Sequence, residues 1–391
     1  MRRSFAARLN WPILACTGLL CAAGLLALWT FSPPDWDDPK VMRNVFVRQA
    51  AFLAVGTALL GVTILPNYLY SRRAAWFFYV VSIAALAALL VLGRTTRGAR
   101  GWFMVGPFMV QPAEFAKIAT VLAVARVLMY AKNLHRWRGL AFPAGVVALP
   151  IGLIFLQPDF GSASLFVPVF LAMLWAAGAR TKHLATILLV LAAAGPFAFR
   201  FGLKEYQRNR ILSFVRPEQA PKDLRYQQEQ SVKASGAGGI GGRGSGEMSG
   251  SYSFYIPDRH SDFVYSLVAE HLGFLGSTAV LALFALFLWQ SLRIAWLSRE
   301  PFGRLVVVGL STFLAFQVYV NVGMTIGVAP ITGLTLPFIS YGGSSLLVTL
   351  LSVGIILNVG ARWVPSFSSR ELNDQVELRA FRPHGALKRV L

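Results

Sequence analysis

The chain has 391 residues, of which 55% are apolar and only 14% are charged, and its mean hydropathy is +0.57. A soluble domain usually carries about a quarter charged residues, so an ordinary soluble fold is excluded. The net charge is +20, but the basic residues fall mostly between apolar runs, where the positive-inside effect places them. No groove-reading or single-strand module is present, so we expect no nucleic acid among the partners. Cys16 and Cys21 both lie in the first apolar run, which indicates neither a disulfide framework nor a thiolate metal site.

Apolar runs long enough to cross a membrane recur along the chain. The first follows a basic N-terminus like that of a signal peptide, but it is longer than the apolar core of such a peptide and suits an uncleaved span. We predict an all-α, polytopic membrane protein with about ten transmembrane helices. The runs lie near residues 12–31, 47–66, 75–92, 113–130, 139–156, 160–178, 183–201, 264–292, 304–326 and 338–360.

The connecting segments divide between two sides by their charge. With the N-terminus inside, every segment predicted to be cytoplasmic is basic, whereas the first outer segment carries Asp35, Asp37 and Asp38. The prediction is a transmembrane domain over residues 1–362, with a large extracytoplasmic loop at about 202–262 between helices 7 and 8. Residues 363–391 are predicted to form a basic cytoplasmic tail.

Two outer segments break the charge rule: the long loop has an excess of Lys and Arg, and a short segment carries the cluster Arg94, Arg97 and Arg100. Long loops are only weakly bound by the rule, so the short cluster is the one that needs an explanation. Two interpretations stay open: anchoring to lipid headgroups, or a site for an anionic ligand such as a lipid pyrophosphate. In the helix that follows, Glu114 and Lys117 are i,i+3 neighbours that can pair. Ionisable residues at membrane depth are costly, so a functional role is the first hypothesis and a purely structural ion pair is the alternative.

Two further polar segments lie at outer helix junctions. Asp159, in QPDFGSA, stands at a helix start, where a carboxylate can act in chemistry or only cap the helix. PITGLTLPFISYGGSSLL brings Ser344 and Ser345 to the outer start of the last span. Small residues there allow close helix packing, and free N–H groups at the same place can hold phosphate oxygens.

The long outer loop contains a glycine-rich stretch and, at its end, an acid/base cluster. Gly239, Gly241 and Gly244 formally satisfy GxGxxG, but no strand precedes them, so a dinucleotide site is rejected. A flexible segment lying against substrate or partner is favoured over a plain linker. The cluster is the richest in the chain and lacks a second nearby His, so it favours a catalytic carboxylate over a metal site, with helix capping as the alternative. Its members are Asp258, His260, Asp262 and Glu270.

These segments, in this order, resemble the SEDS family (shape, elongation, division and sporulation proteins). The resemblance covers roughly residues 45–360 through GARGWF, QPAEFAK, QPDFGSA, YQRNRI, the stretch from Gln230 and Ser231 to Gly244, HSDFVYS and GLTLPFISYGGSS. YQRNRI and NVGMTIGVAPITG are closer to the RodA branch than to the FtsW branch. The chain departs from the family at Asp258, where Glu is usual, and at Ala269-Glu270-His271, where an acidic pair is usual.

The resemblance implies a peptidoglycan glycosyltransferase that polymerises lipid II into a growing glycan for cell elongation and rod shape. It also implies a class B penicillin-binding transpeptidase as partner within an elongation or division complex. The location would be the outer face of the bacterial cytoplasmic (inner) membrane, with both termini cytoplasmic. No cofactor is certain, and a divalent cation, Mg or Mn, stays open.

By the same resemblance, Asp262 matches the essential loop carboxylate and is assigned as general base, and Asp159 matches a second important carboxylate. Asp159 would orient the acceptor or hold a cation. Arg100, Lys117 and Arg210 are candidates to bind the leaving pyrophosphate. The remaining predicted substrate-binding residues are Trp102, Glu114, Gln230, Ser231, His260, Ser344 and Ser345. A lipid II flippase, an FtsW-like division polymerase and a non-catalytic scaffold are the alternatives.

Overall fold

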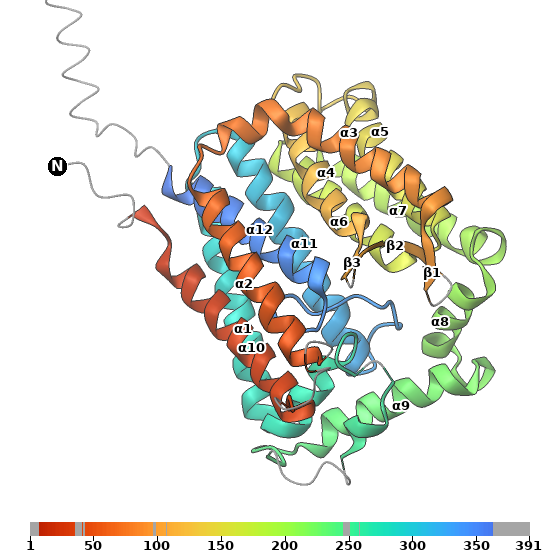
Figure 1. Ribbon diagram of the computed structural model, residues 1–391. Helices are drawn as coiled ribbons and strands as arrows, with labels where there is room; N and C mark the ends of the chain where they lie inside the picture. The colour runs from red at the N-terminus through yellow and green to blue at the C-terminus, as the bar shows by residue number, and fades with distance from the viewer. Residues whose placement is uncertain are drawn as a thin grey trace, which may run out of the picture.

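The computed structural model describes residues 8–35, 41, 44–96, 99–106, 108–244, 251–257 and 259–362. Each of the ten predicted spans is an α-helix there (Figure 1). Seven are long and apolar enough to cross a membrane: α1 (Trp11–Phe31), α2 (Val45–Ile64), α3 (Leu69–Leu92), α5 (Trp137–Leu156), α10 (Val264–Leu297), α11 (Pro301–Thr325) and α12 (Gly343–Ala361). Three are shorter: α4 (Pro112–Leu128), α6 (Phe160–Ala176) and α7 (Thr181–Phe197). The predicted helical, multi-pass membrane architecture is confirmed.

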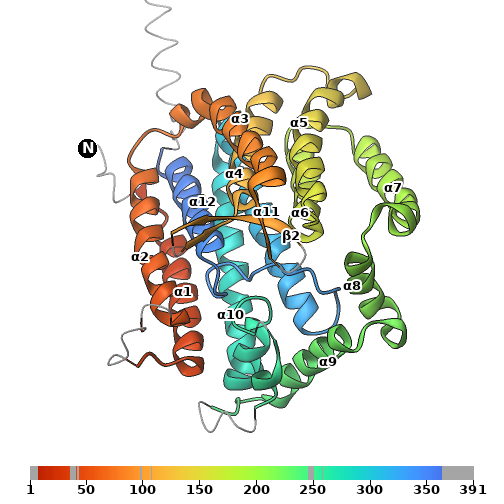
Figure 2. The same ribbon diagram turned by 45° about the vertical axis from the view of Figure 1, so that its right-hand side comes forward.

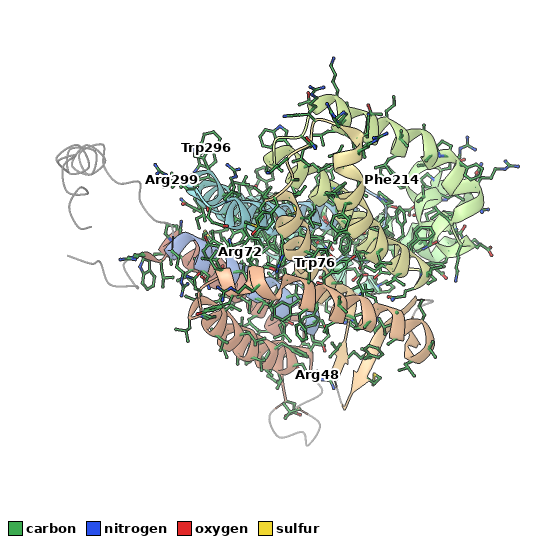
Figure 3. All side chains as sticks on the ribbon, turned by 90° about the horizontal axis from the view of Figure 1, so that it is seen from above. Arg48, Arg72, Trp76, Phe214, Trp296 and Arg299 are labelled. Atoms are coloured by element: carbon green, nitrogen blue, oxygen red, sulfur yellow. The ribbon has the colours of Figure 1, made fainter. Side chains whose placement is uncertain are left out.

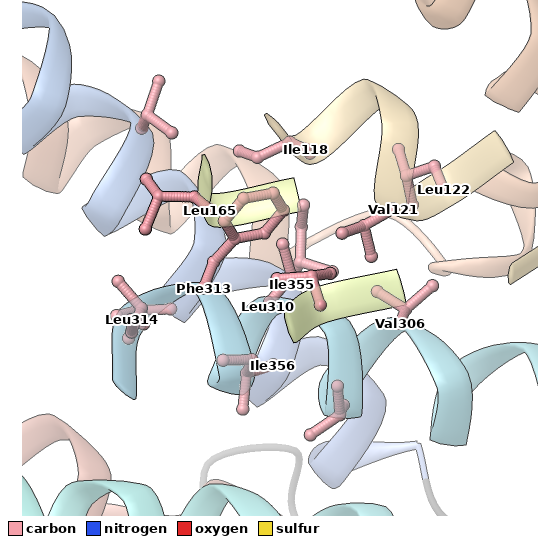
Figure 4. Packing of buried hydrophobic residues seen from close by; sticks show 14 of the residues in the cluster. Ile118, Val121, Leu122, Leu165, Val306, Leu310, Phe313, Leu314, Ile355 and Ile356 are labelled. Atoms are coloured by element: carbon pink, nitrogen blue, oxygen red, sulfur yellow. The ribbon is translucent and has the colours of Figure 1, made fainter. Parts of the chain in front are cut away.

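The centre of the bundle is built from α4, α6, α11 and α12. Figure 4 shows Val121, Leu165, Phe313 and Ile355, one from each of these helices, meeting in one cluster of buried side chains. Glycine permits the closest approach: a Cβ on Gly354 of α12 would lie 2.0 Å from the hydroxyl of a threonine on α2. In a bilayer such close packing, rather than burial from water, holds helices together.

Helix α7 stands apart at the edge of the bundle (Figure 2). His183 is the one residue of α7 that the structure buries, while Leu189 and Phe197 are 70% and 69% exposed. An apolar helix with so little protein around it is suited to contact with lipid on most of its surface.

The two ends of the bundle differ in what they carry. At one end, Asn10 Nδ2 donates to Gln290 Oε1 (3.4 Å) and Arg362 Nη1 donates to the carbonyl of Ile64 (2.9 Å), so the start of α1 and the ends of α2, α10 and α12 lie together. Arg72 and Arg299 belong to this basic end, seen from above in Figure 3. The described part of the long loop lies at the opposite end (Figure 1).

A small sheet lies in the outer segment before α4. Strands β1 (Arg94–Thr96), β2 (Ala99–Val105) and β3 (Phe108–Val110) pair antiparallel in the order β1-β2-β3, with Phe103 opposite Val110. Gly106 takes φ +60° in the turn between β2 and β3, a conformation that glycine adopts without steric cost. Within the predicted arginine cluster, Arg94 and Arg100 lie in strands, and Arg97 falls outside the described residues.

The long loop is largely ordered into helices. It holds α8 (Glu205–Val215) and α9 (Lys222–Ala237), a π-helical turn at Ala198–Gly202, and 3₁₀ turns at Pro217–Gln219 and Tyr252–Tyr255. Residues 245–250 and Asp258 fall outside the described part of the chain.

The glycine-rich residues 238–244, predicted to be a flexible segment, lie against α10. Helix α10 is broken at Gly273 (φ 66°, ψ −165°), which frees backbone groups on both sides of the break. The glycine-rich segment pairs with them: the N–H of Phe274 donates to the carbonyl of Gly239 (2.8 Å), and the N–H of Arg243 donates to that of Glu270 (3.0 Å). The glycines therefore permit contact between two backbones rather than mobility.

The segment between α11 and α12 re-enters the bundle without regular structure, although Ile331, Leu336 and Ile339 are buried. Irregular backbone at membrane depth is tolerated only where protein buries it or where it lines a cavity. Side chains from distant helices satisfy its carbonyls: Gln49 Nε2 donates to Ser340 O (3.0 Å) and Arg210 Nη1 donates to Thr332 O (3.1 Å). This re-entrant segment forms one wall of the site described next.

Candidate active site

A cavity of about 380 Å³ opens at the end of the bundle that carries the sheet, α8 and α9. Its lining comes from α2, the sheet, the starts of α4, α6 and α12, α8, the segment before α10 and the re-entrant segment. Eight of the predicted site residues line it: Trp102, Glu114, Asp159, Arg210, His260, Asp262, Ser344 and Ser345. The structure therefore brings together side chains that are up to 243 positions apart in the sequence, as Trp102 and Ser345 are.

Asp159 is the N-cap residue of α6. Its Oδ1 accepts from the backbone N–H of Ser162 (3.0 Å) and its Oδ2 accepts from the Ser162 hydroxyl (2.7 Å) and from Gln111 Nε2 (3.2 Å). The capping interpretation of Asp159 is thus present in the structure, and the carboxylate still lines the cavity. The two interpretations left open by the sequence are compatible, because a cap fixes a carboxylate in place without removing its charge.

Asp262 lies in the segment just before α10 and is half-buried. It faces Gly333 of the re-entrant segment: a Cβ on that glycine would lie 3.7 Å from Asp262 Oδ2 and 3.5 Å from Arg210 Nη1. A carboxylate and a guanidinium therefore flank the same bare stretch of backbone. Glycine at this position, with φ +77°, leaves the space between them for a ligand.

Helix α8 carries Arg210 and docks beside Asp159. The hydroxyl of Tyr206 donates to the carbonyl of Pro158, which joins α8 to the α5–α6 turn. The Arg210 guanidinium lies 6.0 Å from the centre of the Tyr206 ring, within the range of a cation–π contact. Burial raises the pKa of the Tyr206 hydroxyl; Asp159 adds to this effect and Arg210 opposes it. Tyr206 is thus a neutral hydrogen-bond donor at neutral pH.

Glu114 and Lys117 form a buried ion pair on α4, with 2.6 Å between Lys117 Nζ and Glu114 Oε1. Glu114 lines the cavity, whereas Lys117, which is 3% exposed, lies behind it. Removing one partner of such a buried pair would leave the other charge buried and uncompensated.

The start of α12 completes the lining. Ser344 Oγ accepts from the backbone N–H of Gln111 (3.0 Å), and the hydroxyls of Ser345 and Thr335 lie 2.8 Å apart. Gly342, the N-cap residue of α12, offers no side chain to cap the helix. The first N–H groups of a helix carry partial positive charge, so this helix start favours an anion in the cavity.

Three predicted substrate-binding residues that the structure describes are not among the cavity lining: Lys117, Gln230 and Ser231. Ser231 on α9 is fully buried and its hydroxyl donates to the carbonyl of Thr325 (2.9 Å), which is a packing contact. Gln230 beside it has a buried Oε1 without a partner among the described residues. The side chain of Arg100 lies outside what the structure describes.

Several residues that line the cavity were missed by the sequence interpretation: Arg48, Phe52, Gln111, Tyr206, Gln207, Thr332, Thr335 and Tyr341. Arg48 had a detectable signal, since it is an ionisable residue inside the second span. Tyr206 and Gln207 belong to YQRNRI, where the prediction selected only the second arginine. The cavity also has a backbone link, because the N–H of Tyr341 donates to the carbonyl of His260 (2.8 Å).

No group of three or more His, Cys, Asp or Glu side chains that could hold a metal ion occurs in the described ranges. The side chains do not form a protein-only metal cage. Mg²⁺ is usually held by one or two carboxylates together with substrate phosphates and water, and Asp159 would fit the protein part of such a site.

Comparison with known proteins agrees with this geometry. A family model described as "Cell cycle protein" (FtsW/RodA/SpoVE) matches residues 10–363. Stage V sporulation protein E of Bacillus subtilis is 34% identical over 353 residues, which cover 89% of this chain and 95% of the relative. A Thiomicrospira cyclica protein named probable peptidoglycan glycosyltransferase FtsW is 36% identical over 342 residues, which cover 84% of this chain and 86% of the relative.

Solved structures show the same likeness. A chain from a study of how a peptidoglycan synthase complex coordinates polymerization and crosslinking superposes with a TM-score of 0.77 at 33% identity, covering 90% of this chain and 97% of that one. The rod shape determining protein RodA of Thermus thermophilus gives a TM-score of 0.69 at 29% identity, covering 92% and 98%. This chain therefore belongs to the FtsW/RodA/SpoVE family of cell cycle proteins, the SEDS family that its motifs resemble.

Proposed function

We propose that this protein, a peptidoglycan glycosyltransferase by its family, polymerises lipid II into glycan strands at the outer face of the bacterial cytoplasmic membrane. The observation that carries the proposal is the cavity that unites Asp159, Asp262 and Arg210 at one end of the bundle. One carboxylate is held by a helix start, the other faces a guanidinium, and the start of α12 supplies partial positive charge. These are the groups that transfer of a sugar from a pyrophosphate needs.

In the proposed step, the 4-hydroxyl of GlcNAc on one lipid II attacks the anomeric carbon of the lipid-linked growing glycan. The hydroxyl proton passes to the Asp262 carboxylate, the new C–O bond forms, and the bond to the pyrophosphate breaks with its electron pair on undecaprenyl pyrophosphate. A positioned base contributes on the order of 10²- to 10⁴-fold to such a step. Arg210, which lines the same cavity, would stabilise the charge that develops on the leaving oxygen.

Arg48 joins the proposed anion-binding groups, because it lines the same cavity from α2. Arg100 and Lys117 were predicted for the same role; we keep Arg100 in the proposal and assign Lys117 to holding Glu114 in place through their ion pair. A divalent cation, Mg²⁺ or Mn²⁺, would be held by Asp159 together with the substrate phosphates and would neutralise the leaving group.

We place the protein in cell elongation and rod shape, with a class B penicillin-binding transpeptidase as partner. The solved relatives include a rod shape determining protein and a chain of a peptidoglycan synthase complex, while curated relatives carry the names FtsW and SpoVE. The RodA-like segment YQRNRI, four residues of which line the cavity wall on α8, supports the elongation branch. The basic end of the bundle, with the start of α1 and the end of α12, would face the cytoplasm.

The test is polymerisation of labelled lipid II by the purified protein in detergent, with and without its transpeptidase. Asp262→Asn should abolish long glycan products, whereas Asp223→Asn, an exposed aspartate on α9 outside the cavity, should leave them unchanged. Wild-type activity of the Asp262→Asn variant would refute the role of Asp262. If neither wild type nor variant polymerises while both move lipid II across vesicle membranes, the flippase alternative takes the place of this proposal.

A further inference from the structure

Helix α11 carries a row of buried polar residues that lies outside the cavity lining. Gln317, Asn321 and Thr325 follow at four-residue spacing, so they share one face of the helix. Their exposed fractions are 3%, 0% and 0%. A polar group buried in a membrane helix costs free energy unless it finds a hydrogen-bond partner, so the partners of this row indicate why the helix keeps it.

Asn321 joins two separate segments of chain. Its Nδ2 donates to the carbonyl of Asp262 (2.9 Å) and to the carbonyl of Leu334 (2.6 Å). A carboxamide has two N–H donors, so a single side chain can hold both carbonyls at once. Its Oδ1 is buried without a hydrogen-bond partner among the described residues. The donors are therefore the part of this side chain that the fold uses.

The two segments held by Asn321 are those that face each other across the cavity wall. Asp262 supplies the carboxylate, and Leu334 follows the glycine that Asp262 and Arg210 both flank. Next to Asp262, the ring of Phe263 is buried in a small cluster with Ala234, Ile256 and Ile331. Apolar contacts of this kind are not directional, so they do not set the distance between the backbone at Asp262 and the backbone at Leu334. The side-chain amide of Asn321 sets that distance, because it donates hydrogen bonds to both carbonyls.

The neighbours in the row hold other groups: Gln317 bonds the residue after Leu334 in the same re-entrant segment, and Thr325 contacts α9. Gln317 Nε2 donates to the carbonyl of Thr335 (3.1 Å), and the carbonyl of Thr325 accepts from the hydroxyl of Ser231 (2.9 Å). The hydroxyl of Thr325 bonds within its own helix, to the carbonyl of Val322 (2.7 Å). Thr325 thus offers a matched control: it lies on the same face and is equally buried, but its side chain touches neither Asp262 nor Leu334 through a hydrogen bond.

We propose that Asn321 is a positioning residue for Asp262, which sets the distance between the Asp262 carboxylate and the re-entrant segment it faces. This inference rests on the proposed role of Asp262 as base. A misplacement of about 1 Å of a reacting group can cost on the order of 10²-fold in rate. Loss of the amide should therefore reduce turnover and leave the binding of substrate, which uses the other cavity groups, nearly unchanged.

The experiment compares wild type, Asn321→Leu and Thr325→Val, purified in detergent. The rate of lipid II polymerisation is measured against lipid II concentration, and retention of lipid II is measured separately by native mass spectrometry. Asn321→Leu should lower kcat about 100-fold with the half-saturating concentration of lipid II changed by less than about threefold. Thr325→Val should behave as wild type in both measurements.

Asn321→His completes the series, since its ring keeps one N–H donor at a similar reach, and it should recover part of the lost kcat. The positioning role is overturned if Asn321→Leu polymerises at the wild-type rate, if it loses lipid II retention together with turnover, or if Thr325→Val is impaired to the same degree. If Asn321→Leu does not yield monodisperse protein, Asn321→His carries the test, and an unchanged kcat in that variant overturns the proposal. Asp262→Asn in the same assay tests the proposed function separately from the positioning role of Asn321. Full activity of the Asp262→Asn variant would refute the role of Asp262 as base.

Discussion

Substitution of Asp159 can distinguish its role as a helix cap from a role in the chemistry of the cavity. The substitution Asp159→Asn keeps an oxygen that can accept from the N–H of Ser162, and Asn is as good an N-cap as Asp. What it removes is the negative charge, together with part of the hydrogen bonding from the Ser162 hydroxyl and Gln111. Stability and activity should therefore respond to different degrees.

The loss of stability can be worked from those contacts. A charge at a helix start contributes about 0.3–1 kcal/mol, and replacing one charge-assisted hydrogen bond by a neutral one costs about 1 kcal/mol. We expect the free energy of unfolding to fall by about 1–2 kcal/mol, measured by thermal unfolding in detergent. Loss of the charge from the cavity should reduce polymerisation about 10- to 100-fold, which corresponds to about 1.4–2.7 kcal/mol in the barrier.

A matched control lies at the other end of the bundle. Glu300 caps α11 by accepting from the N–H of Gly303 (2.5 Å), far from the cavity. Glu300→Gln should lower stability to a similar degree and leave polymerisation at the wild-type rate. If Asp159→Asn polymerises lipid II as fast as wild type, Asp159 serves only as a cap and the assignment of a chemical role is refuted.

Three more predictions address the fold, the docking of α8 and the cation. Gly273→Ala should destabilise the protein by about 2–3 kcal/mol and speed proteolysis in the glycine-rich segment; unchanged digestion would contradict this. The reason is that the new Cβ would lie 2.2 Å from the backbone nitrogen of Gly242, and that φ at Gly273 is positive. Tyr206→Phe removes the hydrogen bond to Pro158 and should raise the half-saturating lipid II concentration about fivefold, with an unchanged value counting against a role for α8 docking. Chelation of divalent cations should abolish polymerisation, and Mg²⁺ or Mn²⁺ should restore it, without shifting the unfolding temperature of the substrate-free protein; full activity in chelator would exclude the cation.

The membrane helices could be predicted from the sequence because span length and apolar content are set by the bilayer itself. The same principle found Glu114 and Lys117, since charge inside an apolar run is conspicuous. It should also have selected Arg48, which lines the cavity from the second span. The strands between 94 and 110 were missed because their residues sit in a short connection, where a span-finding pattern has nothing to match.

Positions that depend on tertiary contacts were harder to predict. The composition of the glycine-rich segment is typical of a flexible linker. Only the structure shows that its backbone bonds to α10 on both sides of the break at Gly273. Ser231 lies beside the same stretch and was predicted to bind substrate, but its hydroxyl bonds the end of α11. Asn321 gave no signal of its own, because a single Asn in an apolar helix does not reveal which carbonyls it will hold.

The way the re-entrant segment is held has a consequence for biosynthesis. The carbonyl of Ser340 accepts from Gln49 on α2, which is 291 residues earlier in the chain. The carbonyl of Thr332 accepts from Arg210 on α8, which is 122 residues earlier. Because a nascent chain emerges N-terminus first, this wall of the cavity forms only after α2 and α8 have been made and the re-entrant segment has packed against them. A chain truncated before the re-entrant segment would have most of its spans in the bilayer but would lack this wall of the cavity.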